Sequence, residues 1–350
     1  MTYGTVNADV IQTSTSGGIL GAGDASIMKN RLINGNMAIS QRSGTSSYST
    51  ASGSTYTLDR WYAGASVTSK YTVQQNAGSV TTQAGFPNYL GITSSSAYSS
   101  SAGDRLAIGQ FIEGYNTADF AWGTASAKTV TLSAWVYSSL TGSFGGSIQN
   151  YTANRSYPFN YTISSANTWT QISVTIPGDT SGTWAGATND GSINVWFNIG
   201  CGSTYLGTAN TWGGADYRGA TGSVAVTGTN GATLYITGVQ LEVGSSATGF
   251  EYVNYQTSLA NCQRYFRLMG SASRPFYVGG YTNNANDTEF PYSFGVDLRT
   301  TPTVTITTLS SANGTPYSDT ASTDKTSIGL ARTATGTQTA SFYATVSAEL

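Results

Sequence analysis

Short stretches in which apolar and polar residues alternate recur through the first 250 residues of the chain. In TVTLSAWVYS, Val130, Leu132, Ala134 and Val136 fall on one face of an extended strand, and WTQISVTIPG repeats the pattern from Ile172. A period of two residues is typical of a strand with one face buried and the other exposed. The alternation therefore predicts a chain built mainly of strands.

Eight segments of this kind are separated by Gly, Ser and Asn turns, with no amphipathic helix between them: 56–65, 70–76, 89–94, 105–113, 129–138, 168–176, 193–200 and 233–243. Consecutive strands without crossover helices favour antiparallel sheets. About eight strands is the number of a jelly roll. We predict an all-β fold in which residues 31–250 form an antiparallel jelly-roll β-sandwich.

A short helix is expected directly after this sandwich. Thr257 or Ser258 suits its N-cap, and largely apolar residues then follow at spacings of three and four, as in a coiled-coil seam: Leu259, Cys262, Phe266 and Met269. A helix of about a dozen residues is marginal alone. We therefore expect residues 251–269 to form a linker whose seam packs on the chain's own domains or on symmetry-related copies.

The last section, residues 270–350, is expected to be a small C-terminal β domain. Strand patterns occur at 304–308, 326–331 and 338–346, and a further strand is expected in the segment that begins SFGVDLR. A unit of about 80 residues buries only a modest fraction of its surface when it stands alone. Trimerisation of this domain, as the tip of a larger assembly, would enlarge its core.

The composition is poor in charge and rich in aromatic and hydroxyl groups. Charged residues make up 9% of the chain, against a usual ~25%. The net charge is -2 and no basic run occurs, which argues against nucleic acid as a partner. No apolar run approaches the ~18 residues of a membrane span, so no membrane insertion is expected. Cys201 and Cys262 fall in different units and are expected to be buried thiols.

Residues 1–30 are rich in Gly, Ser and Thr and show no sustained period. One interpretation is a flexible terminus. The other is an anchor that becomes ordered when it docks on a larger assembly.

Several segments resemble a module of fibre proteins from tailed bacteriophages: KNRLINGNMAISQR (29–42), YTLDRWYAG (56–64), ATLYITGVQLEVG (232–244) and the helix LANCQRYF (259–266). In that family the module begins a jelly-roll sandwich of the carbohydrate-binding-module type. The resemblance implies that residues 1–30 attach the chain to other virion proteins. Association through the helix seam and the small C-terminal domain indicates a homotrimer, and host surface polysaccharide is the expected ligand.

The sequence offers little for catalysis. It contains no histidine, the commonest proton shuttle and metal ligand, and no CxxC or phosphate-binding loop. A glycosidase needs only two carboxylates, and six acidic residues are candidates: Asp104, Glu113, Asp119, Asp179, Asp190 and Asp216. Turns and surface ion pairs explain them more simply, so we expect no enzyme and no cofactor. Asp190, in the loop GATNDGS, is a weak candidate for calcium.

Aromatic side chains are the candidates for glycan binding, because a ring stacks on the C–H face of a sugar while amides and hydroxyls bond its rim. Strand aromatics such as Trp135, Trp196 and Phe197 are assigned to the core or the sheet surface. Rings in loops either bind ligand or pin the loop, and both interpretations stay open for the candidates: Trp184, Tyr205, Trp212, Tyr217, Phe276, Tyr277, Tyr281 and Tyr292. Scarce charge predicts attachment that varies little with salt.

The sequence therefore predicts a structural virion protein, assembled in the host cytoplasm, that serves as a tail fibre subunit and binds host glycan. Two alternatives remain. One is a head fibre or decoration protein attached to the capsid. The other is a carbohydrate-active enzyme or its glycan-binding module.

Overall fold

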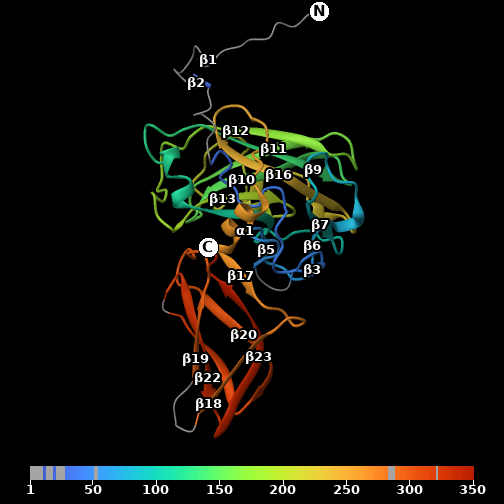
Figure 1. Ribbon diagram of the computed structural model, residues 1–350. Coiled ribbons are helices and arrows are strands. Elements are labelled where there is room, and N and C mark those ends of the chain that lie inside the picture. The colour runs from blue at the N-terminus through green and yellow to red at the C-terminus, as the bar shows by residue number, and fades with distance from the viewer. Residues whose placement is uncertain (1–10, 13–18, 21–27, 51–53, 283–287, 321) are drawn as a thin grey trace, which may run out of the picture.

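The computed structural model describes residues 11–12, 19–20, 28–50, 54–282, 288–320 and 322–350. Figure 1 shows a rounded body built from residues 28–250 and an elongated C-terminal domain that extends away from it. The expected anchor, residues 1–30, lies largely outside the described residues. Its described part includes one short antiparallel pair, β1 (Ile11–Gln12) and β2 (Ile19–Leu20).

The body contains two six-stranded antiparallel sheets. Sheet I has the order β11-β10-β13-β8-β5-β4, formed by β4 (Thr55–Tyr56), β5 (Tyr62–Ala65), β8 (Leu106–Glu113), β10 (Gly142–Asn150), β11 (Ser156–Ile163) and β13 (Gly191–Asn198). Sheet II has the order β12-β9-β16-β7-β6-β3, formed by β3 (Tyr48–Ser49), β6 (Tyr71–Gln75), β7 (Leu90–Ser94), β9 (Val130–Ser138), β12 (Thr170–Ile176) and β16 (Thr233–Val243).

The core of the body lies between these sheets. Leu132 and Val136 point inward from β9, and Val195 and Phe197 point inward from β13. All four are fully buried, because each second residue of a strand faces the opposite sheet. The prediction of an antiparallel jelly-roll sandwich is confirmed, with twelve described strands in place of about eight.

Short elements connect these strands. β14 (Leu206–Gly207) and β15 (Gly219–Ala220) pair in parallel within the long loop that follows β13. Single 3-10 turns complete the body at Ala77–Ser79, Gly114–Asn116, Ala118–Phe120, Ser203–Tyr205 and Val226–Gly228. The strand expected at 56–65 is divided between β4 and β5 by a turn in which Arg60 has a φ of 69°.

Two of the segments that carry the fibre resemblance lie side by side. Arg31 N donates to Leu241 O at 2.9 Å, and Val239 N donates to Gly35 O at 2.9 Å. The pairing of β16 with β7 ends at Ile236, and residues 30–35 lie beside the second half of β16. Gly238, which has a φ of 59°, lies where the register of β16 with β9 shifts. Residues 31–39, which include the buried Leu32, Met37 and Ile39, are therefore an integral part of the sandwich.

The helix α1 (Tyr255–Gln263) is shorter than expected. Its N-cap is Asn254, whose side chain accepts a hydrogen bond from Thr257 N at 2.9 Å, so the expected cap at Thr257 or Ser258 is wrong by three or four residues. The coiled-coil interpretation of the seam is also wrong. Phe266 and Met269 belong to a strand, and together with Cys262 they are buried inside this chain.

The C-terminal domain consists of two sheets packed face to face. Its first sheet contains β17 (Phe266–Met269), β18 (Phe276–Thr282), β20 (Thr303–Ala312) and β23 (Gly336–Ser347), and its second contains β19 (Thr288–Ser293), β21 (Gly314–Asp319) and β22 (Lys325–Arg332). A separate core, which includes Phe294, Leu330 and Phe342, lies between them. The strand expected to begin in SFGVDLR is wrong, because β19 ends at Ser293.

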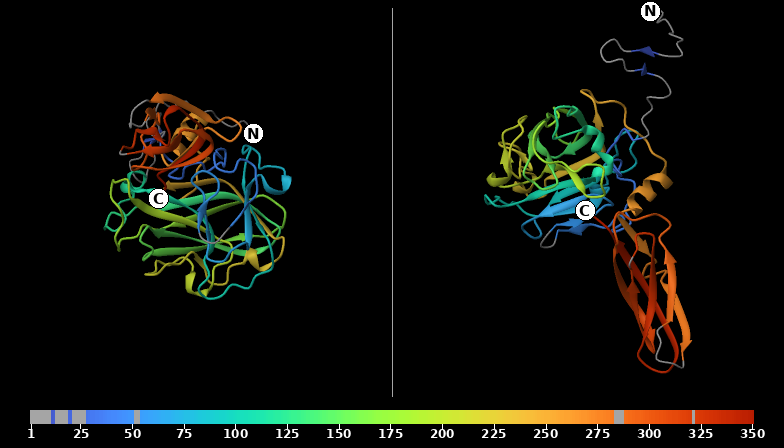
Figure 2. Two further views of the ribbon diagram at one scale, coloured as in Figure 1. Left: turned by 90° about the horizontal axis from the view of Figure 1, so that it is seen from below. Right: turned by 90° about the vertical axis from the view of Figure 1, so that its left-hand side faces the viewer.

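Buried charges join this domain to the body. Glu349 forms ion pairs with Arg60, which is 1% exposed, and with Arg42 at 2.7 Å. Arg264 pairs with Glu113 at 2.5 Å, and Tyr265 Oη donates to the same carboxylate at 2.6 Å. Figure 2 shows α1 at this junction, between the sandwich and the base of the C-terminal domain. Because unpaired buried charges are costly, these contacts fix how the domain sits on the body.

Both cysteines are free and buried, as expected. Burial raises the pKa of the Cys201 thiol to about 12, which keeps it protonated at neutral pH. Within the described part of the chain, no helix has the length and apolar character needed to cross a membrane.

Candidate functional site

The outer face of sheet I carries a cleft of about 560 Å³ that is lined by aromatic rings. Val195 and Phe197 of β13 enter the core, so Asn194 and Trp196 project from the opposite face. Across the sheet, Trp196 and Tyr62 both lie opposite Gly109, and Asn194 lies opposite Phe111. The register of three strands therefore gathers these side chains in one place, which we call the aromatic cleft.

The rings of the aromatic cleft form a continuous series. Phe111 lies 4.9 Å from Tyr62, 5.4 Å from Trp196 and 5.7 Å from Tyr151 between ring centroids, each in an edge-to-face arrangement. Trp196 is 1% exposed, whereas Tyr151 is 42% exposed. Tyr62 and Phe111 are half-buried. Trp196 thus forms the base, and the other three rings offer surfaces to a ligand.

Two glycines allow these rings to lie against the backbone. A Cβ at Gly109 would come within 2.4 Å of the Trp196 ring, and a Cβ at Gly191 would come within 2.2 Å of the Tyr151 ring. Contacts this short do not occur in folded proteins, so any side chain at either position would displace its ring. The hollow in sheet I depends on these two positions.

Asn194, one of the residues that line the aromatic cleft, carries an acceptor without a partner. Its Nδ2 donates to Gln149 Oε1 at 3.3 Å, and the same oxygen accepts from Trp196 Nε1 at 2.8 Å. Gln149 is oriented in turn by a 2.7 Å bond to Asp216. Asn194 Oδ1 is buried and has no hydrogen-bond partner. A buried polar atom without a partner is costly, and a ligand hydroxyl would satisfy it.

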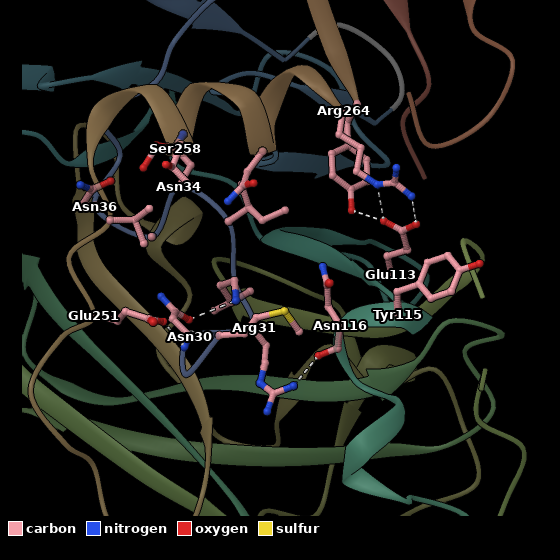
Figure 3. Close-up of a pocket in the computed structure, with 18 of the residues that line it drawn as sticks. Asn30, Arg31, Asn34, Asn36, Glu113, Tyr115, Asn116, Glu251, Ser258 and Arg264 are labelled. Carbon is pink, nitrogen blue, oxygen red and sulfur yellow. Dashed lines mark hydrogen bonds and ion pairs between the residues drawn. The ribbon is translucent and has the colours of Figure 1, made fainter. Parts of the chain in front are cut away.

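A second cavity, of about 480 Å³, lies where α1 meets residues 28–36 of the sandwich. Figure 3 shows that several of its polar groups are already engaged: Arg264 with Glu113, Arg31 with Asn116, and Asn30 with Glu251. This junction pocket therefore uses much of its polar lining to hold the segments together. The aromatic cleft is the better candidate for a ligand site.

Trp184 and Trp212 belong to a different aromatic group. They lie 5.7 Å apart and pack edge to face on Trp122, at 4.7 and 5.4 Å. Each indole donates to a nearby loop, from Trp184 Nε1 to Asp179 at 3.2 Å and from Trp212 Nε1 to the Pro177 carbonyl at 2.9 Å. These contacts are those of rings that pin loops on the sandwich.

Tyr205 and Tyr217 lie in the long loop beside the aromatic cleft. The Tyr205 ring is within 6 Å of two guanidinium groups, those of Arg105 at 5.6 Å and Arg218 at 5.9 Å. Tyr217 packs over Gly207, where a Cβ would come within 2.5 Å of its ring. Tyr205 therefore borders the cleft, whereas Tyr217 closes the loop.

The C-terminal candidates are dispersed. Phe276 stacks on Phe342 at 6.1 Å and contacts Tyr292 at 5.8 Å, so both candidates pack on the core of that domain. Tyr277 is 79% exposed. Tyr281 lies in β18, but its side chain is outside the described residues. Tyr277 is therefore the open ring among those described at this end of the molecule.

The candidate carboxylates are mostly engaged by the protein itself: Asp104 with Tyr98, Glu113 with Arg264, Asp119 with Arg31, Asp179 with Arg155, and Asp216 with Arg218. Asp190, the calcium candidate, accepts a hydrogen bond from Thr188 Oγ1 at 3.4 Å. Where side chains are described, no three His, Cys, Asp or Glu residues gather closely enough to hold a metal ion.

Sequence reasoning missed most of the aromatic cleft. Trp196 was assigned to the core or sheet surface, and Tyr62, Phe111 and Tyr151 were not candidates. A signal exists in β8, where Gly109 and Phe111 follow each other on the face opposite to Ile108 and Ile112. A glycine beside an aromatic on one strand face indicates a position where a neighbouring ring lies close. Only the strand pairing shows which ring this is.

No protein-family model and no curated protein matches the chain. Solved structures show distant likeness. The enzymatically active domain of tailspike protein 4 from bacteriophage CBA120 is 12% identical, with a TM-score of 0.34, over 62% of this chain and 22% of its own length. A family 4 carbohydrate-binding module is 16% identical, with a TM-score of 0.30, over 60% of this chain and 98% of its own.

A family 11 carbohydrate-binding module from Clostridium thermocellum, in complex with a β-1,3-1,4-mixed-linked tetrasaccharide, is 12% identical, with a TM-score of 0.27. That match covers 57% of this chain and 100% of the module. This chain therefore spans the length of the two modules but only about a fifth of the tailspike domain. All three TM-scores are below 0.5, so the jelly-roll assignment rests on the chain's own two sheets.

Proposed function

We propose that this chain is a non-enzymatic tail fibre subunit of a tailed phage, and that its sandwich binds a host cell-surface glycan in the aromatic cleft. The observation that carries the binding proposal is the combination of exposed rings with the unpartnered acceptor Asn194 Oδ1 on one sheet face. Rings supply stacking surface, and a buried acceptor selects a hydroxyl. Both features suit a sugar.

The virion role is supported by the segments that resemble phage fibre modules. Two of them, residues 29–42 and 232–244, meet in the fold through hydrogen bonds between their backbones. On this proposal, residues 1–30 attach the chain to other virion proteins and the assembled protein is a homotrimer. Most of the candidate carboxylates are bound to tyrosine or arginine side chains of the protein itself. This supports a binding role in preference to catalysis.

Binding is tested on an array of bacterial surface polysaccharides with two matched variants. Tyr151→Ala removes an exposed ring of the aromatic cleft, and Tyr277→Ala removes an exposed ring of the C-terminal domain. We expect Tyr151→Ala to weaken binding about tenfold, which corresponds to ~1.4 kcal/mol, in the range of one aromatic contact. Tyr277→Ala should bind as the unmodified protein does, and both variants should keep its melting temperature.

The two variants also separate the possible failures. If Tyr277→Ala loses binding and Tyr151→Ala does not, the glycan site lies on the C-terminal domain. If the unmodified protein binds no polysaccharide on the array, glycan binding itself is wrong.

A further inference from the structure

The lining of the aromatic cleft is unusual for a chain with so few charges. It includes two arginines, Arg105 and Arg218, and no Asp or Glu side chain among the described residues that form it. A ligand in the cleft therefore meets positive charge without a facing carboxylate.

The two guanidinium groups differ in how far they are compensated. Arg218 forms a two-pronged ion pair with Asp216, at 3.1 and 3.2 Å, and lies 4.6 Å from the centre of the Trp196 ring. Arg105 is exposed and forms no ion pair with any described carboxylate. Its uncompensated charge is thus available to a ligand.

The nearest acidic neighbour in the sequence does not cancel this charge. Asp104 is 7% exposed, and its oxygens accept hydrogen bonds from Tyr98 Oη at 2.6 Å and Ser101 N at 2.7 Å. Lys70 lies close enough to help lower the pKa of Asp104. Asp104 is buried in its own hydrogen bonds and Asp216 is paired with Arg218, so Arg105 is the uncompensated charge that this part of the cleft presents to a ligand.

The positive charge and the open rings occupy opposite ends of the cleft. Arg105 directly precedes β8, whereas Phe111 is near its end and contacts Tyr151. Phe111 lies six residues after Arg105 along the extended strand, which is about 20 Å at ~3.3 Å per residue. The cleft is therefore long enough to place one sugar against Arg105 and other sugars of the same chain over the rings.

We propose that the aromatic cleft binds an acidic glycan, with a negatively charged sugar substituent at Arg105 and uncharged units stacked on Phe111 and Tyr151. The substituent is a carboxylate or an ester phosphate or sulfate, since the planar guanidinium suits each of these groups. The inference rests on the proposed glycan-binding function. It replaces the expectation that attachment varies little with salt.

The test compares acidic and neutral polysaccharides on one array and then titrates the best acidic ligand. We expect acidic ligands to bind at least about tenfold more tightly than neutral ones, because a charge-assisted contact is about twice as strong as a neutral one. Their affinity should fall as salt rises from about 0.01 M to about 0.3 M, since screening shortens the reach of exposed charges.

Arg105→Gln should weaken acidic binding about tenfold, the loss of one charge-assisted contact, and remove most of the salt dependence. Arg274→Gln is the matched control, since it removes an exposed arginine from the C-terminal domain and changes the net charge equally. That control should bind acidic ligands as the unmodified protein does.

Chemical treatment of the ligand identifies the charged group. Carboxyl reduction of the polysaccharide abolishes binding if the group is a uronic acid. Removal of phosphate or sulfate esters abolishes binding if the group is an ester phosphate or sulfate. Equal binding of acidic and neutral polysaccharides, or unchanged acidic binding by Arg105→Gln, would overturn the inference while glycan binding stands. Binding of no polysaccharide at all would instead refute the proposed function.

Discussion

Single side chains decide whether the outer face of sheet I is closed or open to a ligand. Trp196 is covered by its neighbours, while Asn194 keeps one oxygen free because Gln149 holds its amide nitrogen. Gly109 and Gly191 leave the space in which the rings lie. The surrounding hydrogen bonds therefore prepare the cleft before a ligand arrives, which lowers the ordering cost of binding.

Asp104 gives a prediction for the pH dependence of stability next to the cleft. Burial alone would raise its pKa, but hydrogen bonds from Tyr98, Ser101 and Ser66 outweigh burial, and the net shift is downward. A carboxylate with a lowered folded-state pKa stabilises the protein above its unfolded-state value of ~3.9, and this contribution is lost as the pH falls through the folded-state value.

We therefore expect Asp104→Asn to reduce the free energy of unfolding at pH 7, with a difference from the unmodified protein that shrinks below about pH 4. Urea unfolding at a series of pH values measures this difference. A difference that stays constant from pH 7 down to pH 2 would show that the Asp104 charge contributes nothing.

Among the elements, strands with regular alternation were predictable and the others were not. β9 and β12 carry clean two-residue alternation, and both were predicted nearly to their ends. β10, by contrast, has the sequence GSFGGSIQN, and its glycines hide the period. α1 was predicted in the right segment, but its start was placed three or four residues too late. Its end was extended too far, because Phe266 fits a helical spacing and also a strand that pairs with β23.

The residues of the candidate site were also predictable only where their position does not depend on the pairing of distant strands. Aromatic residues in loops are the obvious candidates for ligand binding in a sequence. Trp184 and Trp212, however, hold their own loops in place through hydrogen bonds. The rings of the cleft sit on strands whose outer face becomes a hollow only through cross-strand register, and register depends on pairing between distant segments. Arg105 and Phe111 are near in the sequence, but Tyr62 and Trp196 reach them only in the folded sheet.

The start of α1 supplies a prediction about assembly. Tyr255 is 60% exposed and Val253 is 39% exposed, and Tyr115 across the junction pocket is 56% exposed. Large apolar side chains gathered on a surface mark sites of association. If the protein is a homotrimer that associates through this surface, light scattering should give three times the chain mass of 36.5 kDa. The double substitution Val253→Ser with Tyr255→Ser should reduce that mass to one chain.

Tyr151→Ser is the matched control for assembly, because Tyr151 is exposed in the cleft and away from α1. It should keep the mass of the unmodified protein. A single-chain mass for the unmodified protein would contradict the homotrimer, and an unchanged trimer in the double variant would place the interface elsewhere.

The whole molecule combines a joint held by ion pairs with the aromatic cleft on the sandwich. Glu113 and Glu349 tie the C-terminal domain to the sandwich through Arg264 and Arg60. The cleft borders this joint, because Tyr56, which contacts Tyr62, donates its hydroxyl to the carbonyl of Leu350 at 2.9 Å. A force transmitted between the two domains would therefore pass through ion pairs whose carboxylates are buried, and such pairs hold their geometry better than exposed ones.

The most direct measurement is the structure of this protein in complex with an oligosaccharide from a polysaccharide that it binds on the array. Our account predicts sugar density in the cleft of sheet I, stacked on Phe111 and Tyr151, with a hydroxyl at hydrogen-bond distance from Asn194 Oδ1 and an acidic substituent at Arg105. Sugar density beside Tyr277 or in the junction pocket, with the aromatic cleft empty, would contradict it.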